Sequence, residues 1–279
     1  MIDHPVFKKF SPVMSIASGN HLYDFIGSAT NTKYKRGWDK FLPPTGKEIQ
    51  GKSPGKDEHY LDWIAVLDSV SSASGSFCMA ELGAGWGPWI TRAALAAKQC
   101  QNIDNIRLLA VEAEPLHYKW TLEHLKDNDI DPLEHVILQG AVSHSPGIAA
   151  FPILENASQD YGAGLNSAGR YSKTYEVLTY SLEQLLAHFD GVIDFLHIDI
   201  QGAEYEAIPP FVQLLSQRVK SMMIGTHISD EKHDQLLSLL MEANWTPELA
   251  LKRNRSHQLE WGEIHINDGF LWLKNHLPI

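Results

Sequence analysis

Residues 76–92 read Ser-Phe-Cys-Met-Ala-Glu-Leu-Gly-Ala-Gly-Trp-Gly-Pro-Trp-Ile-Thr-Arg, and this stretch decides the fold. Residues 77–82 predict a short buried strand, and residues 89–98 have the pattern of a helix. Three glycines at alternate positions separate the two elements. Glycine lets a backbone turn sharply and approach a ligand without a Cβ in the way. We therefore predict a strand that ends in a ligand-binding turn and continues as a helix.

An acidic residue, Glu81, stands two positions before the first of these glycines, in the pattern Glu81-x-Gly83-x-Gly85-x-Gly87. Dinucleotide-binding folds use the spacing G-x-G-x-x-G, and a carboxylate at the strand end would repel their pyrophosphate. Both features argue against a nicotinamide-dependent oxidoreductase. The carboxylate suits a ligand with a positively charged end, such as the amino group of a methionine moiety. A tight turn that binds nothing is the alternative interpretation.

The chain has 279 residues, enough for one large domain with an appendage. No apolar run reaches the ~18 residues of a membrane span, and the N-terminus lacks the basic-then-apolar pattern of a signal peptide. The two cysteines, Cys78 and Cys100, lie in apolar surroundings and are expected to be reduced packing residues. These features predict a cytoplasmic protein.

The formal net charge of −11 argues against general nucleic-acid binding. The first 60 residues differ from the rest, because they carry more Lys and Arg than Asp and Glu. Prolines and glycines recur there without a sustained hydrophobic period. This predicts an irregular N-terminal cap over residues 1–60 with short helices, one near His21 to Gly27, and a main domain over residues 61–279. A basic cluster in the cap is either a solvated face or a receptor for an anionic or sugar-phosphate substrate; it comprises Lys33, Lys35, Arg36 and Lys40, around Tyr34 and Trp38.

A helix is expected to begin at Asp57 and to end by Gly75, and strands and helices alternate after the glycine turn. This alternation predicts an α/β fold with a parallel sheet. Predicted strands cover residues 77–82, 106–112, 136–142, 193–198, 221–225, 245–251 and 269–274. Predicted helices cover residues 89–98, 116–127, 181–189, 205–216 and 230–244. Residues 143–175 are expected to be irregular, with an extended piece near 149–153, and a long loop is expected between 251 and 269.

Polar residues fall at the carboxyl ends of several predicted strands, and ligands bind along that edge in an open parallel sheet. Glu112 ends the second strand and can accept hydrogen bonds from both ribose hydroxyls of a nucleoside, each worth roughly 1.5–3 kcal/mol. Glu114 is the rival for this role, although an acid at a helix start also suits the helix dipole. The residues at this edge are Glu81 with the glycines, Glu112, Gly140 with Ala141, Asp199 and His227.

Residues 194–204 read Asp-Phe-Leu-His-Ile-Asp-Ile-Gln-Gly-Ala-Glu and form the second informative stretch. His197 and Asp199 share one face of a strand, and Glu204 starts the next helix. His227 ends the following strand and lies beside Asp199 if the two strands are neighbours. Buried carboxylates are costly unless they are paired or functional. The alternatives are that Asp199 caps a helix and that His227 is structural.

Two further patterns are weaker. Residues 208–211, Ile-Pro-Pro-Phe, resemble the Asp/Asn-Pro-Pro-Tyr/Phe motif of enzymes that methylate amino groups in nucleic acids. They lack the Asp or Asn and lie inside a predicted helix, so we reject this interpretation. Glu263, His265 and Asn267 alternate as on one strand face, but no second His or Cys stands at ligand spacing, which disfavours a metal site there.

With these residues the chain resembles the FkbM family of S-adenosylmethionine-dependent methyltransferases over roughly residues 75–275. The resemblance implies a Rossmann-like class I methyltransferase fold, with a mostly parallel seven-stranded sheet and an antiparallel C-terminal strand. It also implies methyl transfer to oxygen, often on a sugar or polyketide hydroxyl. Two positions depart from the family pattern, because Glu112-Ala-Glu-Pro replaces Glu-Pro-Asp-Pro and Gln201 replaces a glutamate. The segments that carry the resemblance are Glu81 to Gly87, Ala110 to Pro115, Gly140 to Ser143, Tyr180 to Leu185, Asp194 to Glu204, Gly225-Thr-His227 and Asp268 to Asn275.

The resemblance implies S-adenosylmethionine as the cofactor. For catalysis we expect Asp199 or His227 as the base for the acceptor hydroxyl, with Glu204 orienting its partner. In a variant of this hypothesis, Asp199, Glu204 and His227 hold a divalent metal, Mg or Mn. The tryptophans at positions 38, 86, 89 and 261 either stack on a sugar ring or pack in the core. The residues expected to bind the cofactor are Glu81, Gly83, Ala84, Gly85, Gly87, Glu112, Ala113, Gly140, Ala141 and Asp199.

The expected partner is a small-molecule or glycan acceptor, without membrane association, and a homo-oligomer is compatible with the sequence. The alternative from another class is a catalytically silent binding protein that keeps the Rossmann-like fold. The intact set of Glu81, Glu112, Asp199 and His227 argues against that alternative.

Overall fold

The computed structural model describes residues 3–275 and contains a seven-stranded sheet in the order β13-β16-β12-β11-β5-β6-β7. Strand β16 is antiparallel to both of its neighbours, while the other neighbouring pairs are parallel. This confirms the predicted α/β fold with a mostly parallel sheet and an antiparallel C-terminal strand. The strands are β5 (Gly75–Leu82), β6 (Ile103–Glu112), β7 (Val136–Gln139), β11 (Ile193–Ile198), β12 (Val219–Thr226), β13 (Trp245–Leu251) and β16 (Gly269–Asn275).

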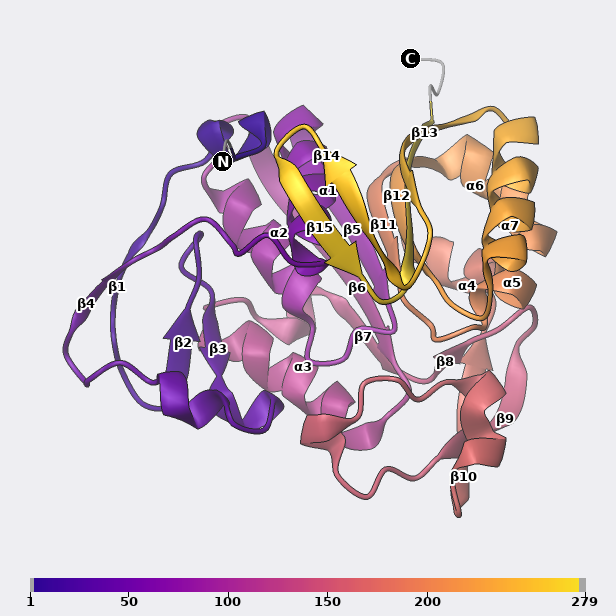
Figure 1. Ribbon diagram of the computed structural model, residues 1–279, viewed down its shortest axis with the longest axis horizontal. Coiled ribbons are helices and arrows are strands. Elements are labelled where there is room, and N and C mark those ends of the chain that lie inside the picture. Colours follow the sequence, from indigo (N-terminus) through magenta and orange to yellow (C-terminus); the bar gives the residue numbers. More distant parts are fainter. Residues whose placement is uncertain (1–2, 276–279) are drawn as a thin grey trace.

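Helices cover both faces of this sheet (Figure 1). One face carries α1 (His59–Ser72), α2 (Pro88–Lys98) and α3 (Pro115–Asp127), and the other carries α4 (Leu182–Leu186), α5 (Glu204–Ala207), α6 (Val212–Arg218) and α7 (Asp230–Glu242). Strand side chains alternate between the two faces. Phe77 and Met79 of β5 therefore join the core beneath α1 and α2, whereas Ala80 and Leu82 join the core beneath α4 to α7.

From residue 3 onward, the N-terminal segment contains three short 3-10 helices and two strand pairs. The prediction of a helix near residues 21–27 is wrong, because a hairpin of β2 (His21–Tyr23) and β3 (Ala29–Asn31) occupies this stretch. Its turn is closed by the N–H of Gly27, which donates to the carbonyl of Asp24 at 3.1 Å, and Gly27 has a φ of 81° that favours glycine. The remaining elements are η1 (Pro5–Lys9), η2 (Thr32–Tyr34), η3 (Trp38–Phe41) and the pair of β1 (Met14–Ile16) with β4 (Glu48–Gln50).

Between β7 and α4 the chain forms a second sheet of three strands, β8 (Ala141–Val142), β10 (Thr174–Tyr180) and β9 (Gly147–Pro152). The strand predicted over residues 136–142 is therefore two strands in two sheets. Gly140 separates the two strands. A Cβ at this position would overlap the ring of Tyr180 and the carbonyl of Leu178, so the close packing leaves no space for a side chain. The insertion, expected to be irregular, also contains η5 (Ala157–Gln159) and η6 (Leu165–Arg170), and η4 (Pro132–Glu134) precedes β7.

Two further predictions are corrected. The helix predicted over residues 205–216 is split into α5, η7 (Pro209–Phe211) and α6, because consecutive prolines cannot donate the hydrogen bonds of a continuous helix. The loop predicted between residues 251 and 269 is a hairpin of β14 (Arg255–Leu259) and β15 (Gly262–Ile266) (Figure 1). Ile264 and Ile266 of this hairpin join the α1-side core. Across residues 3–275, none of the helices has the length and apolar character needed to cross a membrane.

Candidate functional site

A cavity opens at the carboxyl ends of β5, β6 and β11, where the glycine turn faces the insertion that follows β7. It encloses about 1040 Å³ of space, including its open mouth. Its walls contain nearly all of the residues that the sequence predicted to bind the cofactor. These are Glu81, Gly83, Ala84, Gly85, Glu112, Ala113, Gly140, Ala141 and Asp199.

The glycine turn is shaped by close backbone packing. Gly83 has a φ of 79°, and a Cβ on it would overlap the carbonyl oxygen of Asp199 in the neighbouring strand end. Gly87 has a φ of 68° and is the N-cap residue of α2, where a Cβ would press on Thr121. Gly87 is not among the described residues that line the cavity. Its packing gives Gly87 a structural role in the turn, and its contact with the cofactor stays a prediction.

Glu81 is almost fully buried at the end of β5. Its carboxylate accepts hydrogen bonds from the N–H groups of Trp89 at 3.3 Å and Ile90 at 2.9 Å, in the first turn of α2. Burial raises the pKa of Glu81 to about 7, although the neighbouring His197 and these hydrogen bonds oppose the shift. A nearby positive charge would stabilise such a carboxylate. Glu81 is thus suited to receive the amino group of a ligand.

Glu112 ends β6 and lies opposite the glycine turn. Its Oε2 accepts the N–H of Gly85 at 2.7 Å, and its Oε1 accepts the N–H of Glu114 at 2.8 Å. Burial raises the pKa of Glu112, with His117 acting against this shift. The side chain of Glu114 accepts the N–H of His117 at 2.6 Å as the N-cap of α3. Glu114 therefore has a structural task of its own, and Glu112 is the better candidate for a ribose contact.

Asp199, Glu204 and His227 lie together, as the sequence predicted. His227 Nδ1 is 3.0 Å from Glu204 Oε1, and His227 Nε2 is 3.3 Å from Asp199 Oδ1. Burial lowers the pKa of His227, but the hydrogen bonds and charges of Asp199 and Glu204 outweigh this and raise it to about 10. At neutral pH His227 is therefore an imidazolium held between two carboxylates. It cannot take a proton from an acceptor, which disfavours His227 as the base.

The same arrangement does not support the metal-binding variant. Within residues 3–275 no group of three or more His, Cys, Asp or Glu residues is arranged to hold a metal ion. Both ring nitrogens of His227 face carboxylates, so the imidazole has no nitrogen left for a metal beside Asp199 and Glu204. Asp199 is the only member of this trio among the described residues that line the cavity.

The structure adds cavity-lining residues to which the sequence assigned no role. His197 of β11 lines the cavity, and its Nε2 is 3.1 Å from Oδ1 of Asp62 in α1. His59, at the start of α1, also lines the cavity and lies 3.7 Å from the same carboxylate. The sequence predicted that His197 and Asp199 share one face of the strand, but it did not predict that Asp62 contacts both His197 and His59. The insertion contributes further walls, namely Phe151, Leu154, Tyr161 and Leu165.

Some of the predicted aromatic and basic residues line the cavity, and the others lie outside it. Trp86 and Trp89 line the cavity, and so does Lys35 from the basic cluster. Trp38 packs edge-on against Trp86 with their ring centroids 5.6 Å apart, while Trp261 packs against His4. The other cluster residues have partners of their own, since Lys33 pairs with Glu123, Arg36 donates to Gln159 and Lys40 lies over Phe41.

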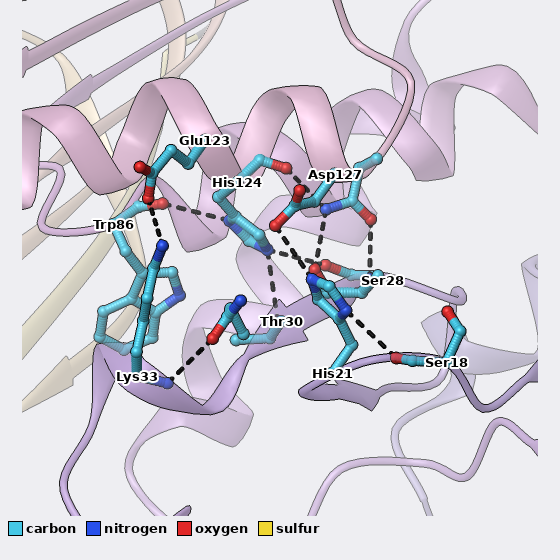
Figure 2. A network of polar contacts seen from close by, with 12 residues as sticks. Ser18, His21, Ser28, Thr30, Lys33, Trp86, Glu123, His124 and Asp127 are labelled. Atoms are coloured by element: carbon cyan, nitrogen blue, oxygen red, sulfur yellow. Dashed lines mark hydrogen bonds and ion pairs between the residues drawn. The ribbon is translucent and has the colours of Figure 1, made fainter. Parts of the chain in front are cut away.

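Figure 2 shows how the N-terminal segment is fixed to α3 and to the glycine turn. His124 of α3 is fully buried, with Nε2 at 3.3 Å from Ser28 Oγ and 3.4 Å from Thr30 Oγ1. Its Nδ1 is 3.1 Å from the carbonyl oxygen of Trp86. The N-terminal hairpin is therefore coupled to the turn that lines the cavity. Two further contacts flank this one, a hydrogen bond between His21 Nε2 and Asp127 Oδ2 at 3.0 Å and an ion pair between Lys33 and Glu123 at 2.6 Å.

The sequence matches the family described as Methyltransferase FkbM domain over residues 78–246. It is 29% identical over 238 residues to a "Putative methyltransferase" of Jannaschia sp. (strain CCS1), a match that covers 80% of this chain and 84% of that protein. Among solved structures, the methyltransferase FkbM of Methylobacillus flagellatus KT is similar with a TM-score of 0.47 and 12% identity, over 75% of this chain and 52% of that chain. The O-methyltransferase of Bacillus cereus, solved in complex with SAH, is similar with a TM-score of 0.44 and 14% identity, over 80% of this chain and 84% of that chain.

Proposed function

The chain belongs to the FkbM methyltransferase family, and we propose that it transfers the methyl group of S-adenosylmethionine to a hydroxyl of a sugar, a glycan or a small natural product. The observation that carries this proposal is the cavity at the carboxyl edge of the sheet. It joins the glycine turn, two buried carboxylates and an apolar end in one continuous wall. A nucleoside with a charged amino-acid tail requires this combination of surfaces.

The residues present fit the cofactor. Glu112 faces the cavity and suits the ribose hydroxyls, while Glu81 suits the ammonium group of the amino-acid tail. The backbone at Gly83 leaves no room for a side chain, which keeps the turn close to the bound molecule. The apolar end suits a flat purine base and is formed by Ala113, Ala141, Phe151 and Leu165.

S-adenosylmethionine, when bound, supplies a methyl group that is already activated by its sulfonium. The protein must then hold the acceptor in line, a contribution of up to ~7–11 kcal/mol in well-aligned reactions. Asp199 is the group we assign to the acceptor hydroxyl, because its carboxylate lines the cavity and is partly exposed. Burial raises the pKa of Asp199, but the hydrogen bonds and charge of His227, with Gln201, outweigh it and hold the pKa below its usual range. Asp199 is thus ionised and can accept the hydrogen bond of the hydroxyl.

Calorimetric binding of S-adenosylhomocysteine tests the cofactor site. Wild-type protein should bind it, and Glu112→Ala should weaken binding about 10- to 100-fold, because hydrogen bonds to a charged group are lost. Glu176→Ala, an exposed glutamate on β10, is the matched control and should bind like wild type. Failure of the wild-type protein to bind would reject the cofactor and, with it, the proposed reaction.

Methyl transfer is tested with labelled S-adenosylmethionine and a panel of alkyl glycosides, oligosaccharides and phenolic or polyketide alcohols. We expect a methyl ether on at least one hydroxyl, a rate that is unchanged by EDTA, and a rate at least 10-fold lower in Asp199→Asn. A protein that binds S-adenosylhomocysteine but methylates no acceptor of the panel would favour the silent binding protein instead.

A further inference from the structure

The buried side chain of His197 has one nitrogen with a partner and one without. Its Nε2 lies 3.1 Å from Asp62 Oδ1, and the ring of Trp89 covers it with centroids 5.8 Å apart and planes at 30°. Among the described residues and their contacts, Nδ1 of His197 finds no hydrogen-bond partner, although the residue is only 2% exposed. A buried polar atom left in this way costs free energy and calls for an explanation. The ring lines the cavity, so a bound molecule can supply the missing partner.

His197 stands directly beside Glu81. The two residues are partners in the parallel register of β11 and β5, so their side chains leave the sheet on the same face. Neighbouring strands lie about 4.7–4.9 Å apart, which places the imidazole and the carboxylate next to each other in the same wall of the cavity. The two side chains offer opposite charges to one ligand.

An α-amino acid carries its ammonium and its carboxylate on a single carbon. A site that receives the ammonium on Glu81 therefore needs a cationic donor within a few ångströms for the carboxylate. We propose that His197, held in place by Asp62, binds the α-carboxylate of the cofactor's amino-acid tail while Glu81 binds its ammonium. This inference rests on the proposed function, and it assigns His197 as a cofactor-binding residue and Asp62 as its positioning residue.

The charges around His197 agree with this role. Burial lowers the pKa of His197, but the hydrogen bond and charge of Asp62, together with the charges of Glu81 and Asp199, outweigh it and give a net upward shift. The ring is thus favoured as an imidazolium, with Nε2–H donating to Asp62 and Nδ1–H free to donate to a carboxylate. His59, whose side chain is 58% exposed, is the other ring beside Asp62.

The first test compares two ligands on the wild-type protein by calorimetry. One is S-adenosylhomocysteine, and the other is the same molecule without its α-carboxylate. We expect the decarboxylated ligand to bind about 10- to 100-fold more weakly, as befits the loss of one charge-assisted hydrogen bond. Equal affinities would overturn the inference, and they would leave the proposed function intact. No binding of either ligand would instead reject the proposed function.

The second test asks whether His197 causes this difference. In His197→Gln the affinity for S-adenosylhomocysteine should fall to that of the decarboxylated ligand, while 5′-methylthioadenosine, which lacks the whole tail, should bind as it does to wild type. Asp62→Asn should reduce the preference for the carboxylate in the same direction. The control His265→Gln, on an exposed hairpin position, should change none of the three affinities. A full carboxylate preference in both His197→Gln and Asp62→Asn would overturn the assignment, as would equal losses for all three ligands.

Discussion

At Gly83 the glycine turn passes so close to the end of β11 that a side chain has no space. A Cβ there would overlap the carbonyl oxygen of Asp199, and the φ of 79° is strained for any other residue. We expect Gly83→Ala to lower the free energy of unfolding by at least about 2 kcal/mol, because overpacking and left-handed strain add. It should also abolish S-adenosylhomocysteine binding. Urea unfolding and calorimetry measure the two effects.

The matched control is Gly191→Ala, since the space around Gly191 is open for a Cβ and its φ is ordinary. This change should leave both the free energy of unfolding and the binding close to wild type. If Gly83→Ala proves as mild as Gly191→Ala, then the turn is more adaptable than its packing indicates.

His227 should make the stability of the protein depend on pH. Its pKa is raised from 6.5 to about 10 in the folded state, so the imidazolium stabilises the fold below pH 6.5 and this contribution is lost as the pH rises towards 10. We expect His227→Gln to cost about 3–5 kcal/mol at pH 6, because two carboxylates lose their shared partner. The difference between variant and wild type should shrink steadily by pH 10. A difference that does not change between pH 6 and pH 10 would show that His227 is neutral in the fold.

Some residues of the candidate site can be recognised from the sequence around them, whereas others depend on partners far away in the chain. Glu81, Glu112 and Asp199 were predictable, because each ends a strand whose apolar run is visible in the sequence. The role that we propose for His197 was not predictable, because its partner Asp62 lies 135 positions earlier in a helix, where an acidic residue normally faces solvent. The raised pKa of His227 was also not predictable from the sequence, since it depends on two carboxylates, one beside each ring nitrogen.

At the scale of elements, His124 connects the N-terminal hairpin to both α3 and the glycine turn (Figure 2). Burial lowers the pKa of His124 to about 3, with a smaller effect from Arg92, so the ring is neutral in the fold. Because the unfolded chain binds this proton more readily, protonation destabilises the protein as the pH falls from about 6.5 towards 3.

Uptake of this one proton should lower the free energy of unfolding by about 1.4 kcal/mol per pH unit. We therefore expect this part of the pH dependence to disappear in His124→Gln. Urea unfolding at pH 7, 6 and 5 measures this slope. His144→Gln, an exposed position beyond β8, is the control and should keep the wild-type slope. An unchanged slope in His124→Gln would mean that His124 is already charged in the folded protein.

The elements of the main sheet were predictable because their patterns are local. The prediction of β11 matches its observed bounds, since Ile193, Phe195, Leu196 and Ile198 dominate the strand and Asp199 follows it directly. The β14–β15 hairpin was missed because its alternating polar residues resemble a loop. Its fully buried core residues are Ile264 and Ile266, while Leu259 and Trp261 pack against the same cluster partly buried. The helix after residue 204 was read as one element, although Pro209 and Pro210 break it.

For the whole molecule, the question is whether the first 60 residues are an appendage or part of the main core. Phe7 of η1 stacks on Tyr60 of α1 with ring centroids 5.2 Å apart, and it packs edge-on against Phe25 at 5.6 Å. All three belong to the same hydrophobic cluster as the α1 face of the sheet. The predicted boundary at residue 60 therefore crosses a shared core.

A pair of phenylalanines in the N-terminal segment tests this directly. Phe7 is 5% exposed and Phe41 is 63% exposed. We expect Phe7→Ala to lower the free energy of unfolding of the whole protein by about 3–5 kcal/mol in a single transition, because a large buried side chain is lost from the common core. Phe41→Ala should stay within about 0.5 kcal/mol of wild type. Circular dichroism and tryptophan fluorescence should report coincident transitions in Phe7→Ala. Two separated transitions, with the major one unmoved, would instead show that the segment unfolds independently of the domain whose cavity it borders.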